Sequence, residues 1–421
     1  MVGWTRVSVL AVPGVLVAAA ALAPACGPRF DGPYPCIAGF ASCGPPGGAG
    51  GACQTNVTTD PQNCGGCGSA CPQGATCASG ACGAPPRVLA SDVSSQEPIA
   101  LNSSAVFYWS SSNKLTGIAK GGGPAFAVPV ASSPGGSQGM TFAVDDTSAY
   151  YVGFGMQGQD EVLASPASPG DGGATPAPRV VATIPSNLGT LPQALLIAGG
   201  TLFGFAQANG NGVTVVAVPT RGGSLRQVAS LAVGSSGQFA VDATRVYVAA
   251  TDQSSCQIVS APVSGGAFST LVADTCTTSS LASDGASLYF AFPLSTYGDN
   301  GAPGSCAVLV QSVPVAGGAS ATVASIPADE LPLQVAVDAS NVYVATNASL
   351  WRAPIAGGTP VRVAGNLGAA ASPQGSGGGG CSYGGGGGGV RPVSLAVDDA
   401  TVYLAVLGAT SSTETLFAIP K

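Results

Sequence analysis

LQVAVDASNVYVATNASLWRAPIAGGTPVRVAGN, residues 333–366, is the stretch that decides the fold. It divides into four short apolar runs, QVAVD, NVYVAT, SLWRAPI and PVRVAG, which we name A, B, C and D in chain order. β-Branched and aromatic residues dominate the runs, and turn-forming residues separate them, as is typical of short β-strands. The stretch therefore predicts one antiparallel sheet of four strands.

Six further units of this kind occupy the chain from residue 84 onward. Run A ends near Asn102, Asp145, Ala198, Asp242, Asp284, Asp338 and Asp398. Run B follows each time, as VFYW, AYYV, TLFGF, VYVA, LYFA, VYVA and VYLA. Run C leads to a glycine pair in six units: Gly121-Gly122, Gly172-Gly173, Gly222-Gly223, Gly265-Gly266, Gly317-Gly318 and Gly357-Gly358. Four strands in a repeat of about 40–45 residues indicate propeller blades. We predict an all-β, seven-bladed β-propeller over residues 84–421.

The repeat has a recognisable form. The A-strand Asp, the aromatic B strand and the C-strand sequence RAPIAGG, residues 352–358, resemble the YWTD-type and related propeller repeats. Propellers of the YWTD type usually have six blades, whereas this chain has seven units. The number of units therefore favours a generic seven-bladed propeller over a member of the YWTD family.

The seventh unit lacks a run D, because the chain ends directly after its run C, TLFAIP. Residues 84–91, APPRVLAS, match run D of the second unit, APRVVAT. A final blade of three strands would leave an open edge. We therefore expect Arg87 to Ser91 to pair beside Leu416 to Pro420, burying Val88 and Leu89.

The first 25 residues predict an export signal. A positive residue, Arg6, precedes the apolar segment VSVLAVPGVLVAAAALA, and Ala23-Pro24-Ala25 is a small-residue cleavage site. The string LAPAC, ending at Cys26, resembles a bacterial lipobox, which implies lipid attachment to Cys26. Removing this one from the 13 cysteines leaves 12, all available for pairing. The resemblance implies an outer-membrane or cell-surface lipoprotein, and a plain secreted protein is the alternative.

Residues 26–83 form a separate region, rich in Cys, Gly and Pro. A segment with so few aliphatic residues needs disulfides in place of a core. The string TDPQNCGGCGSAC resembles the cysteine-rich repeats of plant stigma-specific proteins and of bacterial surface lipoproteins. That resemblance implies a small disulfide module without catalytic residues. The alternative is a zinc site of four thiolates: Cys64, Cys67, Cys77 and Cys82.

Four cysteines lie in the propeller region. Cys256 and Cys306 precede run C of their units, whereas Cys276 and Cys381 follow run D. The B–C and D–A connections of a propeller share one side of the ring, which we call the loop face. We expect a Cys256–Cys276 disulfide within one blade, and Cys306–Cys381 as the second pair.

The longest insertions, 293–307 and 367–392, belong to the same loop face. Loops on a rigid scaffold commonly carry binding residues, so we expect the recognition surface there. The candidate contact residues are Tyr297 and Tyr383, because they lie in the insertions rather than at repeat positions.

Composition excludes several functions. Lys and Arg number only 13 and form no cluster, which argues against nucleic-acid binding. The chain has no histidine, which excludes Ser-His-Asp catalysis and His-ligated zinc. The repeated aspartates of run A are expected to accept hydrogen bonds from turn backbone rather than to bind metal or catalyse. The adjacent pairs Asp145-Asp146 and Asp398-Asp399 are expected to be solvated turns rather than glycosidase carboxylates.

These features predict a monomeric binding or scaffold protein of the cell envelope, with no cofactor, no metal and no catalytic residue. Its partner is expected to be an envelope protein, a peptide or a glycan, and its contact with the membrane only through the lipid. An exported propeller enzyme acting on glycans, a lyase or a hydrolase, is the alternative.

Overall fold

The structure is a computed structural model. In the N-terminal part it describes residues 40–41, 43, 55–71, 75, 77–78 and 81–94. From residue 98 it describes the chain to 421 except for 131–140, 155–158, 169–175, 186–193, 209–211, 233–234, 252–255, 274–278, 298–302, 327–330, 348, 366–390 and 408–412. The elements found in these residues are all β-strands.

Seven four-stranded antiparallel sheets form the body of the protein, as predicted. Blades 1 to 3 contain β6 (Ala100–Leu101), β7 (Ala105–Trp109), β8 (Leu115–Ala119), β9 (Phe126–Ala127); β10 (Phe142–Val144), β11 (Ser148–Phe154), β12 (Asp160–Pro166), β13 (Arg179–Thr183); and β14 (Ala194–Ala198), β15 (Thr201–Ala208), β16 (Gly212–Pro219), β17 (Arg226–Leu231). Blades 4 and 5 contain β18 (Ser235–Val241), β19 (Arg245–Thr251), β20 (Cys256–Pro262), β21 (Ser269–Val272); and β22 (Ala282–Ser283), β23 (Ser287–Tyr297), β24 (Pro303–Pro314), β25 (Ala321–Ile326). Blades 6 and 7 contain β26 (Pro332–Val337), β27 (Asn341–Thr346), β28 (Ser349–Pro354), β29 (Val361–Gly365); and β30 (Arg391–Val397), β31 (Thr401–Leu407), β32 (Thr413–Pro420) with β5 (Arg87–Ser94).

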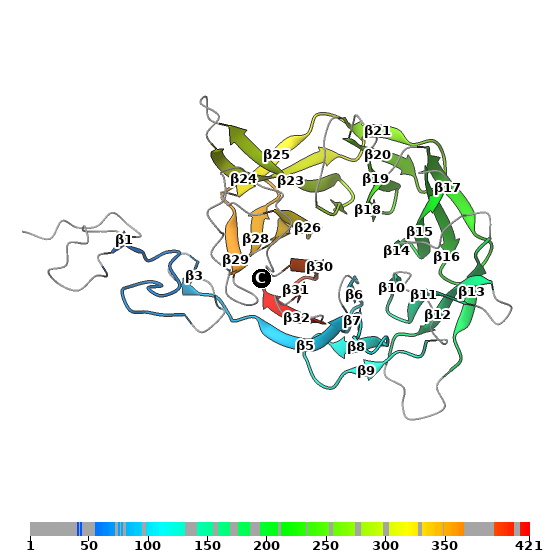
Figure 1. The fold of residues 1–421 in the computed structure, drawn as a ribbon, viewed down its shortest axis with the longest axis horizontal. Coiled ribbons are helices and arrows are strands. Elements are labelled where there is room, and N and C mark those ends of the chain that lie inside the picture. Colours follow the sequence, from blue (N-terminus) through cyan, green and yellow to red (C-terminus); the bar gives the residue numbers. More distant parts are fainter. Residues whose placement is uncertain are drawn as a thin grey trace, which may run out of the picture.

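The blades surround a central axis, with the first strand of each blade innermost (Figure 1). The core is divided into seven apolar layers, one between each pair of neighbouring blades. In one layer, Phe203 and Val215 of blade 3 pack with Val246 and Val259 of blade 4. Both faces of a blade are therefore covered, which explains why the B runs are apolar throughout rather than alternating.

The N-terminal strand closes the ring, as predicted. β5 pairs antiparallel with β32, and Arg87 lies opposite Ala418. The pairing is longer than expected, because it continues to Ser94 opposite Thr413. The expected burial of Val88 is wrong, since this side chain is 55% exposed. Two register shifts in the pairing turn the strand, so that Val93, fully buried, fills the layer between blades 7 and 1.

Two further expectations are corrected. Insertion 293–307, expected as a loop, extends the β23–β24 hairpin, with Leu294 opposite Ala307 and Tyr297 opposite Pro303. In blade 1 the left-handed glycines are Gly122 and Gly123, one residue later than predicted, with φ of 83° and 122°. A positive φ at both positions requires glycine there.

The cysteine-rich segment precedes β5 and lies outside the ring (Figure 1). It contains two small ladders, β1 (Phe40–Ala41) with β2 (Thr55–Asn56) and β3 (Cys77–Ala78) with β4 (Ala81–Cys82). Its disulfides are Cys43–Cys67, Cys64–Cys77 and Cys71–Cys82 among the described residues. Covalent links thus take the place of an apolar core in this segment.

Candidate functional site

The repeated aspartates hold the A–B turns together. In blade 4, Oδ1 of Asp242 accepts hydrogen bonds from the backbone N–H of Thr244 and Arg245, at 2.7 and 2.9 Å. Oδ2 accepts the hydroxyl of Tyr247 at 2.6 Å. The same bonds recur at Asp145, Asp284, Asp338 and Asp398, each with the tyrosine five residues later. We call this unit the Asp–Tyr clasp, and it supports the structural interpretation of these carboxylates.

The two blades without a run-A aspartate also lack the tyrosine. Blade 3 has Ala198 and, five residues later, Phe203. Blade 1 has Asn102, whose Oδ1 still accepts turn N–H groups of Ser104 and Ala105, together with Phe107. A buried tyrosine hydroxyl needs a hydrogen-bond acceptor. A blade without the run-A carboxylate is therefore expected to have phenylalanine in place of the tyrosine.

The clasps change the pKa values of both partners. Burial, the hydrogen bond to Asp284 and the charge of that carboxylate raise the pKa of Tyr289 to about 12. Burial and the charge of Asp398 likewise raise the pKa of Tyr403 to about 12. Burial opposes ionisation of Asp338, but Lys421, the turn backbone and Tyr343 donate hydrogen bonds that lower its pKa to about 2. Asp338 is therefore ionised at neutral pH and Tyr289 and Tyr403 are neutral, which suits a fixed structural unit rather than proton transfer.

The adjacent carboxylates diverge, as expected. Asp145 is turned toward its own turn and Tyr150, whereas Oδ1 of Asp146 accepts the backbone N–H of Ser103 in blade 1 at 2.8 Å. The two carboxylates of this pair thus serve different blades. This geometry opposes their use as two carboxylates facing one glycosidic bond.

Charged residues also join neighbouring blades at the ring closure. Lys120 of blade 1 forms an ion pair with Asp398 of blade 7 at 2.9 Å. Lys421 of blade 7 forms one with Asp338 of blade 6 and lies over the Tyr343 ring. The Arg87 guanidinium of β5 donates hydrogen bonds to the carbonyls of Lys120 and Gly121. These three cations were not predicted, because nothing in their local sequence identifies residues on other blades as partners.

Much of the loop face lies outside the described residues, and its described parts include the turn 110–114 of blade 1 and the β23–β24 hairpin. The β23 and β24 strands have 11 and 12 residues, whereas the β19 and β20 strands of blade 4 have seven each, so the β23–β24 hairpin is the longer of the two. Leu294, on this hairpin, is one of three large apolar side chains that are exposed among the described residues, with Val88 and Val180. The backbone of Tyr297 ends β23. Tyr383 and insertion 367–392, except for 391–392 in β30, lie outside the described residues, as does Cys26.

The propeller cysteines are only partly described. Cys256 begins β20 rather than preceding it, and it is disulfide-bonded. Cys306 belongs to β24 rather than to a loop. Cys276 and Cys381 lie outside the described residues, so both predicted pairings stay predictions.

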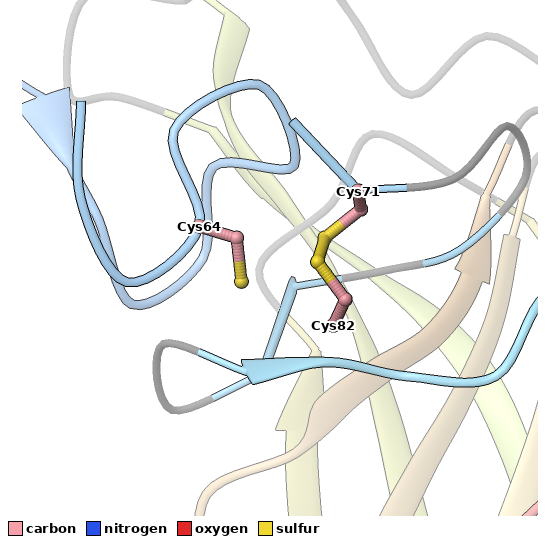
Figure 2. A group of neighbouring side chains, drawn as sticks. All are labelled: Cys64, Cys71 and Cys82. Carbon is pink, nitrogen blue, oxygen red and sulfur yellow. A yellow bond between two sulfur atoms is a disulfide. The ribbon is translucent and has the colours of Figure 1, made fainter. Parts of the chain in front are cut away.

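The thiolate-zinc alternative is wrong, because all four of its cysteines are disulfide-bonded. Cys67 pairs with Cys43, and Cys64 with Cys77. The sulfur atoms of Cys64, Cys71 and Cys82 nevertheless lie within 4.8 Å of one another (Figure 2). A disulfide sulfur carries no thiolate charge, so this group is no metal site in its oxidised state.

The chain matches no protein-family model and no curated protein in sequence. Solved structures do resemble its fold. An oligogalacturonate lyase from Vibrio parahaemolyticus aligns with a TM-score of 0.52 at 8% identity, covering 79% of this chain and 91% of the lyase. YCF48 bound to D1 peptide aligns with a TM-score of 0.50 at 9% identity, covering 80% of this chain and 96% of YCF48. At these identities the similarity shows the propeller fold alone. In the described part of the chain, no helix has the length and hydrophobicity needed to cross a bilayer.

Proposed function

We propose that this chain is an exported, lipid-anchored envelope protein that acts as a binding or scaffold module. Its attachment point is Cys26, its spacer is the cysteine-rich module, and its binding surface is the loop face of the propeller. The disulfides favour an extracytoplasmic location, because such bonds form and persist in oxidising compartments.

The observation that carries the proposal is a closed ring that, in the described residues, carries a long β23–β24 hairpin. Seven packed apolar layers and a closing strand fix the blades, so the strand ends that border the loop face have fixed relative positions. The β23–β24 hairpin extends this face and exposes Leu294. We propose a peptide or protein partner; the YCF48 structure, which contains a D1 peptide, is a propeller with such a ligand.

We propose that the propeller has no catalytic activity. The five run-A aspartates are committed to clasps, and two of them are also ion-paired across blades. These groups therefore serve the stability of the ring. A glycan-cleaving enzyme would instead need carboxylates, or a base with a tyrosine, converging on one substrate.

The experiment is capture of envelope proteins and peptides by the soluble form that lacks residues 1–26. One variant shortens the hairpin by removing 296–305, and a second also removes 367–390. The matched control is the double variant Arg221→Ala, Asp399→Asn, which changes the face of the propeller opposite the loop face. We expect both shortened variants to lose partner capture at unchanged melting temperature while the control retains it. Unchanged capture after both deletions would reject the loop face as the binding surface.

A further inference from the structure

We propose that the disulfides Cys64–Cys77 and Cys71–Cys82 form a thiol–disulfide exchange site, with a thiolate from a small thiol or a dithiol oxidoreductase as its reaction partner. The site is the group of sulfur atoms drawn in Figure 2, completed by Cys77, the bonded partner of Cys64.

Proximity is the first requirement for exchange, and the structure meets it. Sγ of Cys64 lies within 4.8 Å of Sγ of both Cys71 and Cys82. The two disulfides are thus neighbours, although they join different residues. A thiolate formed from one of them is positioned beside the sulfur atoms of the other, with little chain movement required.

Accessibility distinguishes the two disulfides. Cys64 and Cys77 are each only 6% exposed, whereas Cys71 is partly exposed and Cys82 is exposed. Exchange depends on access of the attacking thiolate to a sulfur atom. An external thiolate therefore reaches the Cys71–Cys82 bond first, at Cys82.

The strand register allows a second pairing of the four cysteines. Cys77 and Cys82 lie directly opposite each other in the β3–β4 ladder. Opposite residues in an antiparallel pair have the close Cα approach that a disulfide needs. The four cysteines therefore have a second connectivity, Cys64–Cys71 with Cys77–Cys82.

The steps are balanced without net oxidation or reduction. The external thiolate attacks Sγ of Cys82, forms a mixed disulfide there and expels Cys71 as a thiolate. Cys71 then attacks Sγ of Cys64, forms Cys64–Cys71 and expels the Cys77 thiolate. Finally Cys77 attacks Sγ of Cys82, forms Cys77–Cys82 and returns the external thiolate.

Exchange alters how the module is attached. Both observed disulfides join segment 55–71 to the β3–β4 hairpin, which leads into the closing strand β5. In the second connectivity each bond stays within its own segment. A thiol would thereby uncouple segment 55–71 from the hairpin while Cys43–Cys67 remains in place.

The first test uses the full chain with Cys77→Ser, which frees Cys64 beside the Cys71–Cys82 bond. Free thiols are trapped by acid and alkylated in denaturant, and the remaining cysteines are then reduced and given a label of different mass. We expect the free thiol to shift from Cys64 to the exposed Cys82, because its thiolate is better solvated. The matched control, Cys43→Ser, frees Cys67, and its label should stay on Cys67. A label on Cys64 with Cys71–Cys82 intact would overturn the proposal.

A second measurement needs no substitution. The native protein is incubated with a low concentration of reduced glutathione and digested with trypsin, which yields the unreduced peptide 30–87. Both observed disulfides span residues 72–76, so backbone cleavage in that stretch releases separate fragments only from the exchanged form. We expect such fragments to accumulate while total free thiol stays constant. Their absence, or equal scrambling of Cys43–Cys67, contradicts the exchange site.

Discussion

Removal of one Asp–Tyr clasp tests the structural role of the run-A carboxylates, and the clasp of blade 4 has the shortest hydroxyl–carboxylate hydrogen bond of the five. Asp242 accepts the Tyr247 hydroxyl at 2.6 Å and also the Ser283 hydroxyl of blade 5 at 2.8 Å. Tyr247 is fully buried and its hydroxyl donates to Asp242, so Asp242→Ala removes the acceptor of that hydroxyl. A hydrogen bond to a charged group contributes about 1.5–3 kcal/mol, and a stranded buried donor costs about 1–3 kcal/mol. We therefore expect Asp242→Ala to lower the free energy of unfolding by about 2–4 kcal/mol.

The assay is a double-mutant cycle followed by urea unfolding. Tyr247→Phe alone should cost about 1–2 kcal/mol, and the double variant should cost less than the sum by about 1–2 kcal/mol, because the stranded hydroxyl is absent. The matched control is blade 3, where Phe203→Tyr adds a hydroxyl but residue 198 is an alanine with no carboxylate to accept it, so this change should destabilise the protein. Strict additivity of Asp242→Ala and Tyr247→Phe would refute the clasp as a coupled unit.

Three further predictions concern pH and disulfides. The pKa of Asp338 is lowered from 3.8 to about 2, so its contribution to the stability of the fold is complete above pH 4 and is lost as pH falls toward 2. Lys421→Gln should raise the pH at which half of the protein is unfolded by acid. An unchanged midpoint would contradict the ion pair. The pKa values of Tyr289 and Tyr403 are raised from 10.0 to about 12, so their contribution to the stability of the fold is present below pH 10 and is lost as pH rises through 12. Tyrosinate absorbance should appear together with loss of the near-ultraviolet circular dichroism signal. Ionisation of these tyrosines with that signal intact would contradict their role in stability. Cys256 is expected to pair with Cys276, and a Cys256–Cys306 peptide from the unreduced protein would refute that pairing.

The repeat could be predicted from sequence because each blade uses the same residue types at the same places. The AVD turn, the apolar B run and the glycine pair recur, and each has a local physical cause. The position of the closing strand was also predictable, since Arg87-Val88 matches Arg179-Val180 of blade 2. Which side chains of β5 are buried was not predictable, because bulges in its pairing with β32 bury Val93 and expose Val88.

Contacts between distant residues were beyond sequence reasoning. Lys120 and Asp398 meet only because the ring closes, and no local pattern records that contact. The disulfide connectivity was equally hidden, since eight cysteines allow roughly a hundred pairings. The loop face was predicted from its insertions, yet one of them is a continued hairpin, because residues 293–297 and 303–307 pair as strands.

The most direct test of the central claim, a ring closed by its N-terminal strand, compares the melting temperatures of soluble forms that start at Pro85 and at Glu97. The shorter form loses β5, and with it the pairing to β32, the burial of Val93 and the Arg87 bonds to blade 1. Burial of one large apolar side chain is worth about 1.5–3 kcal/mol, and each kcal/mol shifts the melting temperature by about 2–4 °C. The account predicts that the form starting at Glu97 melts lower by roughly 5–10 °C. Equal melting temperatures would contradict closure by this strand.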